Sequence, residues 1–185
     1  MPAPLEFHFD FSSPYGYLAA EKIEALATRY GRGVDWRPML LGAAFKVAGT
    51  QPLMSIPLKG DYAKRDLPRS ARFHGIELRM PSRFPIATQA PARIILWQRE
   101  CDRSGCASLV KALYRAYFIA NRDISDPNVA ADVPAGLAAH PQGAPAPLPP
   151  AGLVVAPTTP GRHPRSARAQ PARPPAHRPP AQPEP

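Results

Sequence analysis

The sequence predicts an α/β fold that opens with a parallel β-α-β unit and continues mainly with helices. Residues 5–11 alternate strictly between apolar and polar side chains, which is typical of a strand. An apolar stripe at helical spacing follows, up to about Tyr30. Residues 34–40 form a second extended segment. Because the order is strand, helix, strand, we expect the two strands to lie parallel.

The ends of the first helix are marked by residues with clear local preferences. Ser13 is a good N-cap, and Pro14 suits the first helical position. Gly31 and Gly33 follow the helical pattern and end it. In the first strand, the polar face would carry Glu6, His8 and Asp10, and we interpret His8 as a structural histidine rather than a base.

Residues 42–127 are predicted to be mainly helical. The expected helices are 41–49, 61–73 with a break at Pro68, 88–100 with Thr88 as the cap, 107–121, and a short helix over 128–133 that ends at Pro134. No segment after residue 40 has the pattern of a further strand up to this point. The β-α-β unit would therefore lack the partner strands that a sheet needs.

The composition changes sharply near residue 127. The seven Phe, six Tyr and two Trp all precede residue 128, whereas 16 of the 27 prolines follow residue 127. A segment that is rich in Pro and Ala and has no aromatic residue cannot bury a core. We therefore expect residues 134–185 to be a low-complexity, disordered Pro/Ala/Arg tail.

Several protein classes are excluded by simple features. No apolar run approaches the length of a membrane helix, and the start lacks the pattern of a secretory signal. Cys101 and Cys106 form neither a disulfide framework nor a zinc site, and the five histidines show no metal-ligand spacing. We expect a cytoplasmic protein without a metal. The net charge of +9 allows a basic tail that binds nucleic acid, but its scattered arginines favour this weakly.

Ser13 is the strongest candidate for a chemical role. It lies where a strand ends and a helix begins, so unpaired backbone N–H groups would face an anion there. From local sequence alone, a plain capping role for Ser13 is the favoured interpretation. Other segments of the chain bear on this choice.

The segment Phe-Asp-Phe-Ser-Ser-Pro-Tyr-Gly-Tyr-Leu-Ala resembles the opening of 2-hydroxychromene-2-carboxylate isomerases. It is similar also to kappa-class glutathione transferases and, more distantly, to the DsbA family. Further matches occur in the family's order at residues 37–42, 45–46, 49–52, 56–62, 84–88 and 121–127. Together they cover roughly residues 5–133, which makes the resemblance specific to this isomerase-like branch.

The resemblance implies a thioredoxin-like fold with an all-helical domain inserted after the second strand. The corresponding division is 1–41 for the N-terminal part of the thioredoxin-like domain, 42–133 for the helical insertion and 134–185 for the tail. The C-terminal ββα half of the family fold has no counterpart in the sequence. Because the tail uses amino acids with GC-rich codons, we expect a frameshift in the gene or its sequencing rather than a native Pro-rich tail.

The resemblance also implies a glutathione site. Thioredoxins carry Cys-x-x-Cys where this chain has residues 13–16, Ser-Pro-Tyr-Gly, so this site cannot exchange disulfides. In the family, the serine that matches Ser13 faces the thiol of glutathione, which serves as cosubstrate and nucleophile. A hydroxyl there can donate a hydrogen bond to the thiolate.

Further residues match, or lie near, the family's binding positions. Lys59 matches the lysine that contacts the glycyl carboxylate of glutathione, and Lys46 is a second basic candidate. Thr50 stands where kappa enzymes carry a glutathione-binding asparagine. Arg83 and Arg93 are candidates for the carboxylate of the substrate. For both lysines, the alternative is an ordinary solvated charge.

The implied reaction is the isomerisation of a small aromatic carboxylate. The glutathione thiolate adds to the chromene ring system, the pyran ring opens, and rotation about the former double bond precedes the loss of glutathione. The family also implies a homodimer. The alternatives are a kappa-like transferase and a truncated thioredoxin-fold remnant without catalytic activity.

Overall fold

The structure is a computed structural model that describes residues 2–138. Its elements are, in order, β1 (Leu5–Phe9), α1 (Pro14–Ala20), α2 (Ile23–Arg29), β2 (Val34–Pro38), α3 (Leu41–Ala48), a 3₁₀ turn η1 (Leu53–Ser55), α4 (Lys59–Phe73), α5 (Gln89–Cys101), α6 (Cys106–Phe118) and α7 (Pro127–Ala138). The predicted disorder of the tail beyond Ala138 lies outside the described residues.

Strands β1 and β2 form a parallel pair, as the order of strand, helix and strand predicts. Leu5 lies opposite Val34, and Phe9 lies opposite Pro38. Within residues 2–138 the sheet has these two strands. The expected alternation holds as far as Phe9, but Asp10, expected on the polar face, is buried with 5% of its surface exposed.

The helix expected to run from Ser13 to Tyr30 is two helices, α1 and α2. The backbone N–H of Lys22 donates to the carbonyl of Ala19 at 3.0 Å, three residues back, which tightens the chain between them. The Glu21 carboxylate at this turn accepts a two-pronged hydrogen bond from Arg115 of α6. A contact with a distant helix therefore holds the turn, and the local helical pattern does not reveal it.

The helical region contains the helices that the sequence predicts. It differs from the prediction at two prolines and at one helix cap. Pro68 lies inside an unbroken α4, where a break was expected. α7 likewise continues through Pro134 to Ala138, beyond its expected end near residue 133. Thr88 occupies the N-cap position of α5 as expected, but its hydroxyl donates to Asp10 and makes no capping hydrogen bond to the helix. At Thr88 a tertiary hydrogen bond therefore outweighs a local capping preference.

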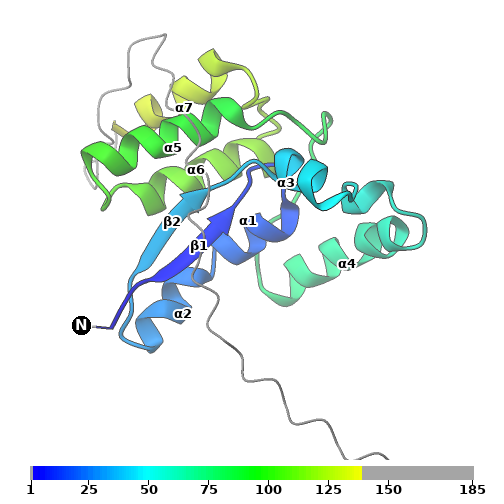
Figure 1. Cartoon of the computed structure of the whole chain (residues 1–185), viewed down its shortest axis with the longest axis horizontal. Helices are drawn as coiled ribbons and strands as arrows, with labels where there is room; N and C mark the ends of the chain where they lie inside the picture. Colours follow the sequence, from blue (N-terminus) through cyan, green and yellow to red (C-terminus); the bar gives the residue numbers. More distant parts are fainter. Residues whose placement is uncertain (1, 139–185) are drawn as a thin grey trace, which may run out of the picture.

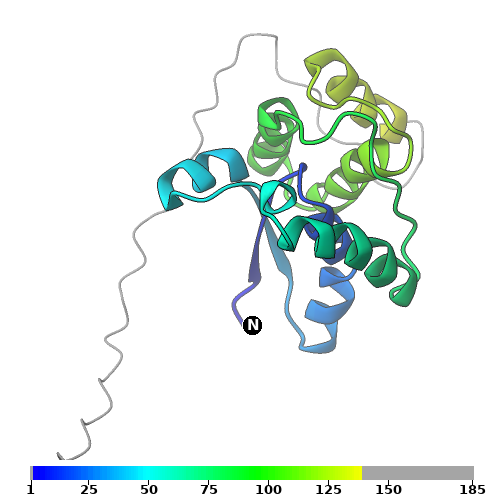
Figure 2. The ribbon, with the colours of Figure 1, turned by 90° about the vertical axis from the view of Figure 1, so that its right-hand side faces the viewer.

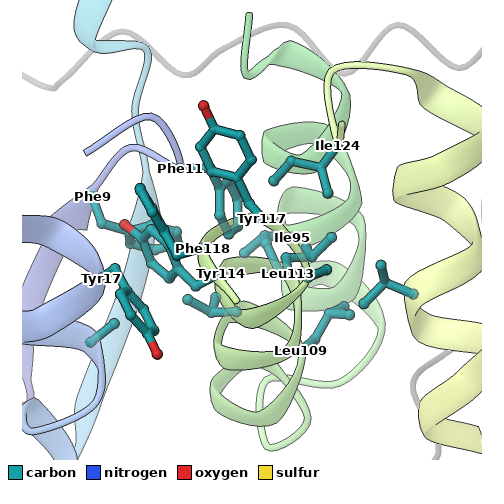
Figure 3. Close-up of a cluster of buried hydrophobic side chains, with 14 of the residues drawn as sticks. Phe9, Phe11, Tyr17, Ile95, Leu109, Leu113, Tyr114, Tyr117, Phe118 and Ile124 are labelled. Atoms are coloured by element: carbon teal, nitrogen blue, oxygen red, sulfur yellow. The ribbon is translucent and has the colours of Figure 1, made fainter. Parts of the chain in front are cut away.

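The helices form two groups about the strands and α1 (Figures 1 and 2). Helices α5, α6 and α7 pack together, whereas α3 and α4 lie apart from them, and α1 contacts both α6 and α4. One continuous core joins the sheet to the helices, and aromatic side chains dominate it (Figure 3). Tyr17 of α1 stacks on Phe118 of α6, with their ring centroids 5.3 Å apart. The first turn of α1 is thus fixed against a rigid neighbour.

Candidate functional site

Asp10 organises the loop that follows β1. Its carboxylate accepts hydrogen bonds from the N–H of Ser12 at 2.7 Å, the N–H of Leu41 at 2.6 Å and the hydroxyl of Thr88 at 3.0 Å. These donors belong to the loop before α1, the start of α3 and the start of α5. One buried side chain therefore fixes three chain segments relative to one another. Because Asp10 holds the backbone of Ser12, it also fixes the position of the next residue, Ser13.

Ser13 stands at the N-cap of α1 and is half-buried. Its Oγ accepts the N–H of Gly16 at 3.0 Å, so the predicted capping role is confirmed. Accepting that bond leaves the hydroxyl proton free to be donated, and it has no acceptor among residues 2–138. The backbone N–H of Tyr15 is likewise without a partner in this part of the chain. Two donors thus remain available to an anion beside Ser13.

A close approach behind Ser13 requires the glycine at position 16. A Cβ built on Gly16 would lie 2.8 Å from the hydroxyl of Tyr114 and 3.1 Å from the Cβ of Ser13. Tyr114 is fully buried and donates to the carbonyl oxygen of Asp10 at 2.9 Å. Burial raises the pKa of Tyr114 well above its ordinary value, so the phenol stays neutral and remains a donor. Ser13 consequently has a rigid support.

A cleft of about 450 Å³ opens beside the first turn of α1. Tyr15, Leu53, Leu58, Lys59, Tyr62 and Ala63 line it, so α1, η1 and α4 all contribute. Apart from the Lys59 ammonium and the two phenol hydroxyls, its lining side chains are apolar. The structure therefore brings Lys59 to the same cleft as the turn that begins at Ser13.

The other candidate residues are placed differently. Lys46 in the last turn of α3 and Thr50 after it are exposed, and neither lines the cleft. Arg83 forms an ion pair with Asp123, with N and O atoms 2.6 Å apart, while most of its side chain stays exposed. Arg93 is exposed on α5. Of the six candidates, the structure brings Ser13's turn and Lys59 together, and their binding roles remain predictions.

The cysteines have no place in this site. Both are free thiols, Cys101 exposed and Cys106 buried. Burial raises the pKa of Cys106 to about 11, so this thiol keeps its proton at neutral pH. Within residues 2–138, no group of three or more His, Cys, Asp and Glu side chains could hold a metal ion. In the same stretch, no helix has the length and apolar character needed to cross a membrane.

Sequence reasoning missed the residues that support Ser13. Alternation predicts Asp10 on the polar face of the first strand, and it does not mark Tyr114 as a partner of the loop. A local signal for Asp10 exists, because an Asp two residues before Ser12 can accept its backbone N–H in an Asx-turn. The partnership of Asp10 with Thr88 spans 78 positions and has no local signal.

The parallel β-α-β unit, the helices that follow β2 and the Ser-Pro-Tyr-Gly turn at the start of α1 define a thioredoxin-like protein with a helical insertion. Residues 4–139 match the family model described as the DSBA-like thioredoxin domain. The chain belongs to this family.

The curated proteins that this chain matches in sequence include glutathione transferases and isomerases. The chain is 36% identical over 105 residues to glutathione S-transferase kappa 1 of Caenorhabditis elegans, which covers 54% of this chain and 46% of that protein. It is 33% identical over 82 residues to 2-hydroxychromene-2-carboxylate isomerase of Pseudomonas putida, covering 43% and 40% respectively. The chain therefore spans about half the length of the curated relatives that it matches.

Solved structures agree with the fold. A structure of 2-hydroxychromene-2-carboxylate isomerase superposes with a TM-score of 0.57 at 26% identity, covering 69% of this chain and 63% of that chain. A putative protein disulfide isomerase from Nitrosomonas europaea superposes with a TM-score of 0.52 at 14% identity, covering 74% and 64%, which is evidence of the fold alone. The predicted relationship to the isomerases, the kappa transferases and the DsbA family is confirmed at this distance.

Proposed function

We propose that this protein is a glutathione-dependent isomerase of the 2-hydroxychromene-2-carboxylate type. The observation that carries the proposal is that Ser13, with its uncommitted hydroxyl proton, begins the turn that walls the cleft holding Lys59. Glutathione has a thiol near its middle and a carboxylate at its glycyl end. The proposed arrangement directs the thiol to Ser13 and the glycyl carboxylate to Lys59.

The role proposed for Ser13 is to favour the thiolate. A free thiol has a pKa of about 8.5, so it is mostly protonated at neutral pH. Lowering that pKa by about one unit needs about 1.4 kcal/mol of preferential stabilisation of the thiolate. A single hydrogen bond to a charged group contributes about 1.5–3 kcal/mol. The Ser13 hydroxyl, assisted by the unpartnered N–H of Tyr15, is sufficient for this.

The role proposed for Lys59 is to anchor the peptide. Its ammonium is exposed at the rim of an otherwise largely apolar cleft, where a carboxylate would be the natural counter-ion. Lys59 is distant from the reacting sulfur in this arrangement. Its removal should therefore weaken binding without altering the acidity of the thiol.

The proposed chemistry borrows its nucleophile from glutathione. The thiolate forms a carbon–sulfur bond with the chromene ring system, and the electron pair released to the ring oxygen opens the pyran ring. After rotation about the former double bond, the carbon–sulfur bond breaks and the thiolate leaves, giving the trans-benzylidenepyruvate. No atom of glutathione is retained in the product, and no redox change occurs.

A kappa-like glutathione transferase is the second candidate. The alignment with the Caenorhabditis elegans kappa enzyme is longer and closer than that with the Pseudomonas putida isomerase. Both activities need the same activated thiolate. They differ in whether glutathione leaves again or stays bonded to the product.

The test measures glutathione binding by calorimetry, thiolate formation by ultraviolet absorbance across pH, and substrate turnover with and without glutathione. Ser13→Ala removes both hydroxyl and cap, whereas Ser13→Gly removes the hydroxyl at a capping cost of only a few tenths of a kcal/mol. We expect both variants to raise the pKa of the bound thiol, so that higher pH recovers part of the rate. Lys59→Ala should weaken glutathione binding and leave the thiol pKa unchanged.

Lys64→Ala is the matched control, since Lys64 is an exposed lysine of α4 that pairs with Asp61 and does not line the cleft. It should bind glutathione like the wild type. Turnover without glutathione, or a Ser13→Gly protein of undiminished rate at every pH, would refute the mechanism. Retention of glutathione in the product would favour the transferase. Absence of glutathione binding would favour a non-catalytic member of the family.

A further inference from the structure

A hydrogen bond ties the first turn of α1 to the middle of α4. The phenol of Tyr15 donates to Oδ2 of Asp66 at 2.9 Å, although the two residues are 51 positions apart. Tyr15 follows Ser13 by two residues, and Asp66 lies about two turns beyond Lys59 on the same helix. This bond therefore links the element that carries Ser13 to the element that carries Lys59.

The acceptor is itself held in place. Asp66 also accepts hydrogen bonds from Arg69 at 2.7 Å, from the hydroxyl of Ser70 at 3.2 Å and, at the longer distance of 3.4 Å, from the phenol of Tyr62. Its side chain is 15% exposed. Hydrogen bonds from Arg69 first, and then from Tyr15, lower the pKa of Asp66, so the group stays a carboxylate and accepts. The tie consequently has a fixed anchor rather than a mobile surface acid.

The donor is equally well defined. Burial first, and then the hydrogen bond to Asp66, raise the pKa of Tyr15 to about 12, so its phenol keeps the proton that it donates. Tyr15 also lines the cleft together with Lys59, and it is the one residue of α1 among the lining residues. One side chain thus shapes the cleft and connects its two sides.

We propose that Tyr15 and Asp66 are a positioning pair that sets the spacing between the Ser13 hydroxyl and the Lys59 ammonium. The inference rests on the proposed glutathione site. The thiol and the glycyl carboxylate of glutathione are joined by a short stretch of covalent bonds, so both can be held only if α1 and α4 keep a matching separation. Neither the Tyr15 phenol nor the Asp66 carboxylate needs to touch the sulfur, and the effect of this pair should depend on the ligand reaching both ends.

The binding experiment compares glutathione with γ-glutamylcysteine, which has the thiol but lacks the glycyl residue. Tyr15→Phe removes only the donor hydroxyl. We expect this change to weaken the binding of glutathione about 3- to 10-fold and the binding of γ-glutamylcysteine less than about 2-fold. In a Lys59→Ala background, Tyr15→Phe should have almost no further effect on glutathione, because one end of the span is already lost.

The matched variants separate positioning from general loosening. Asp66→Ala should reproduce the effect of Tyr15→Phe, whereas Asp66→Asn retains an acceptor oxygen and should recover most of the affinity. Asp61→Asn is the control, because Asp61 is an exposed acid on the same helix that pairs with Lys64 and not with Tyr15. It should bind both ligands like the wild type.

Hydrogen exchange in the ligand-free protein tests the tie between α1 and α4 independently of glutathione binding. The amides of Gly16 and Tyr17 are hydrogen-bonded to Ser13, and their hydrogen exchange reports the stability of this turn. We expect exchange at both amides to be several-fold faster in Tyr15→Phe and unchanged in Asp61→Asn.

Unchanged exchange in Tyr15→Phe would overturn the inference, whether or not glutathione binds. An equal loss of affinity for both ligands would overturn the inference as well, since a general loosening of the site would then explain the loss. If exchange changes as expected but the wild type binds neither ligand, the proposed glutathione function fails and the spacing role with it, while the structural tie between α1 and α4 is confirmed.

Discussion

Replacing Asp10 by alanine is expected to destabilise the protein strongly, because Asp10 is the shared acceptor of the loop after β1. The substitution leaves the backbone N–H groups of Ser12 and Leu41 and the hydroxyl of Thr88 without their acceptor. Each orphaned buried donor costs about 1–3 kcal/mol. Allowing for a water molecule that enters the vacated space, we expect a total loss of about 3–6 kcal/mol. That is a large part of the usual stability of about 5–15 kcal/mol.

The Asp10→Asn variant tests the same reasoning with less disruption. Its amide has one oxygen, which can serve Leu41 and Thr88, while its NH₂ group then faces the N–H of Ser12. The stability of Asp10→Asn should therefore lie between those of the wild type and Asp10→Ala. Asp61→Ala provides the exposed-acid control and should change stability by no more than about 0.5 kcal/mol.

Urea denaturation followed by far-ultraviolet circular dichroism gives the free energies of unfolding. With a denaturant slope of about 2 kcal/mol per molar, Asp10→Ala should unfold at a urea concentration lower by about 1.5–3 M. In a double-mutant cycle, Thr88→Val should cost less in the Asp10→Ala background than in the wild type. A loss below about 1 kcal/mol for Asp10→Ala, or additive effects in the cycle, would refute the assignment of Asp10 as the shared acceptor.

Three further predictions follow from the buried groups. Gly16→Ala should lower the melting temperature, because overpacking against the hydroxyl of Tyr114 costs about 1–3 kcal/mol and outweighs the gain of up to about 1 kcal/mol in helix propensity; adding Tyr114→Phe should recover part of the loss. A thiol reagent should modify Cys101 quickly in the native protein and Cys106 only on unfolding, and equal rates would contradict the burial of Cys106. Burial raises the pKa of Asp35, but hydrogen bonds and charge from two arginines outweigh it and lower the net value. Its stabilising effect should persist above about pH 4 and fall as acid titrates the folded protein below that value, and acid titration of Asp35→Asn should show a smaller loss.

The cap at the start of α1 shows what local sequence can decide. Ser13 accepts the N–H of a residue three positions later, and Pro14 has the fixed backbone angle of a first helical position, so both preferences act within one turn. The alternation that predicts β1 is equally local, because successive side chains of a strand point to opposite faces. The family-specific segments of the sequence also indicate the fold.

The environment of Ser13 was decided by the tertiary structure. Asp10 could be placed on the polar face of a strand by alternation alone, yet it is buried because Leu41 and Thr88 bring their donors to it. Tyr15 and Asp66 meet only because α1 packs against α4. Local patterns fix secondary structure since capping and alternating burial act over a few residues. The partner of a buried polar group depends instead on which distant segments meet, and that is a property of the packed chain.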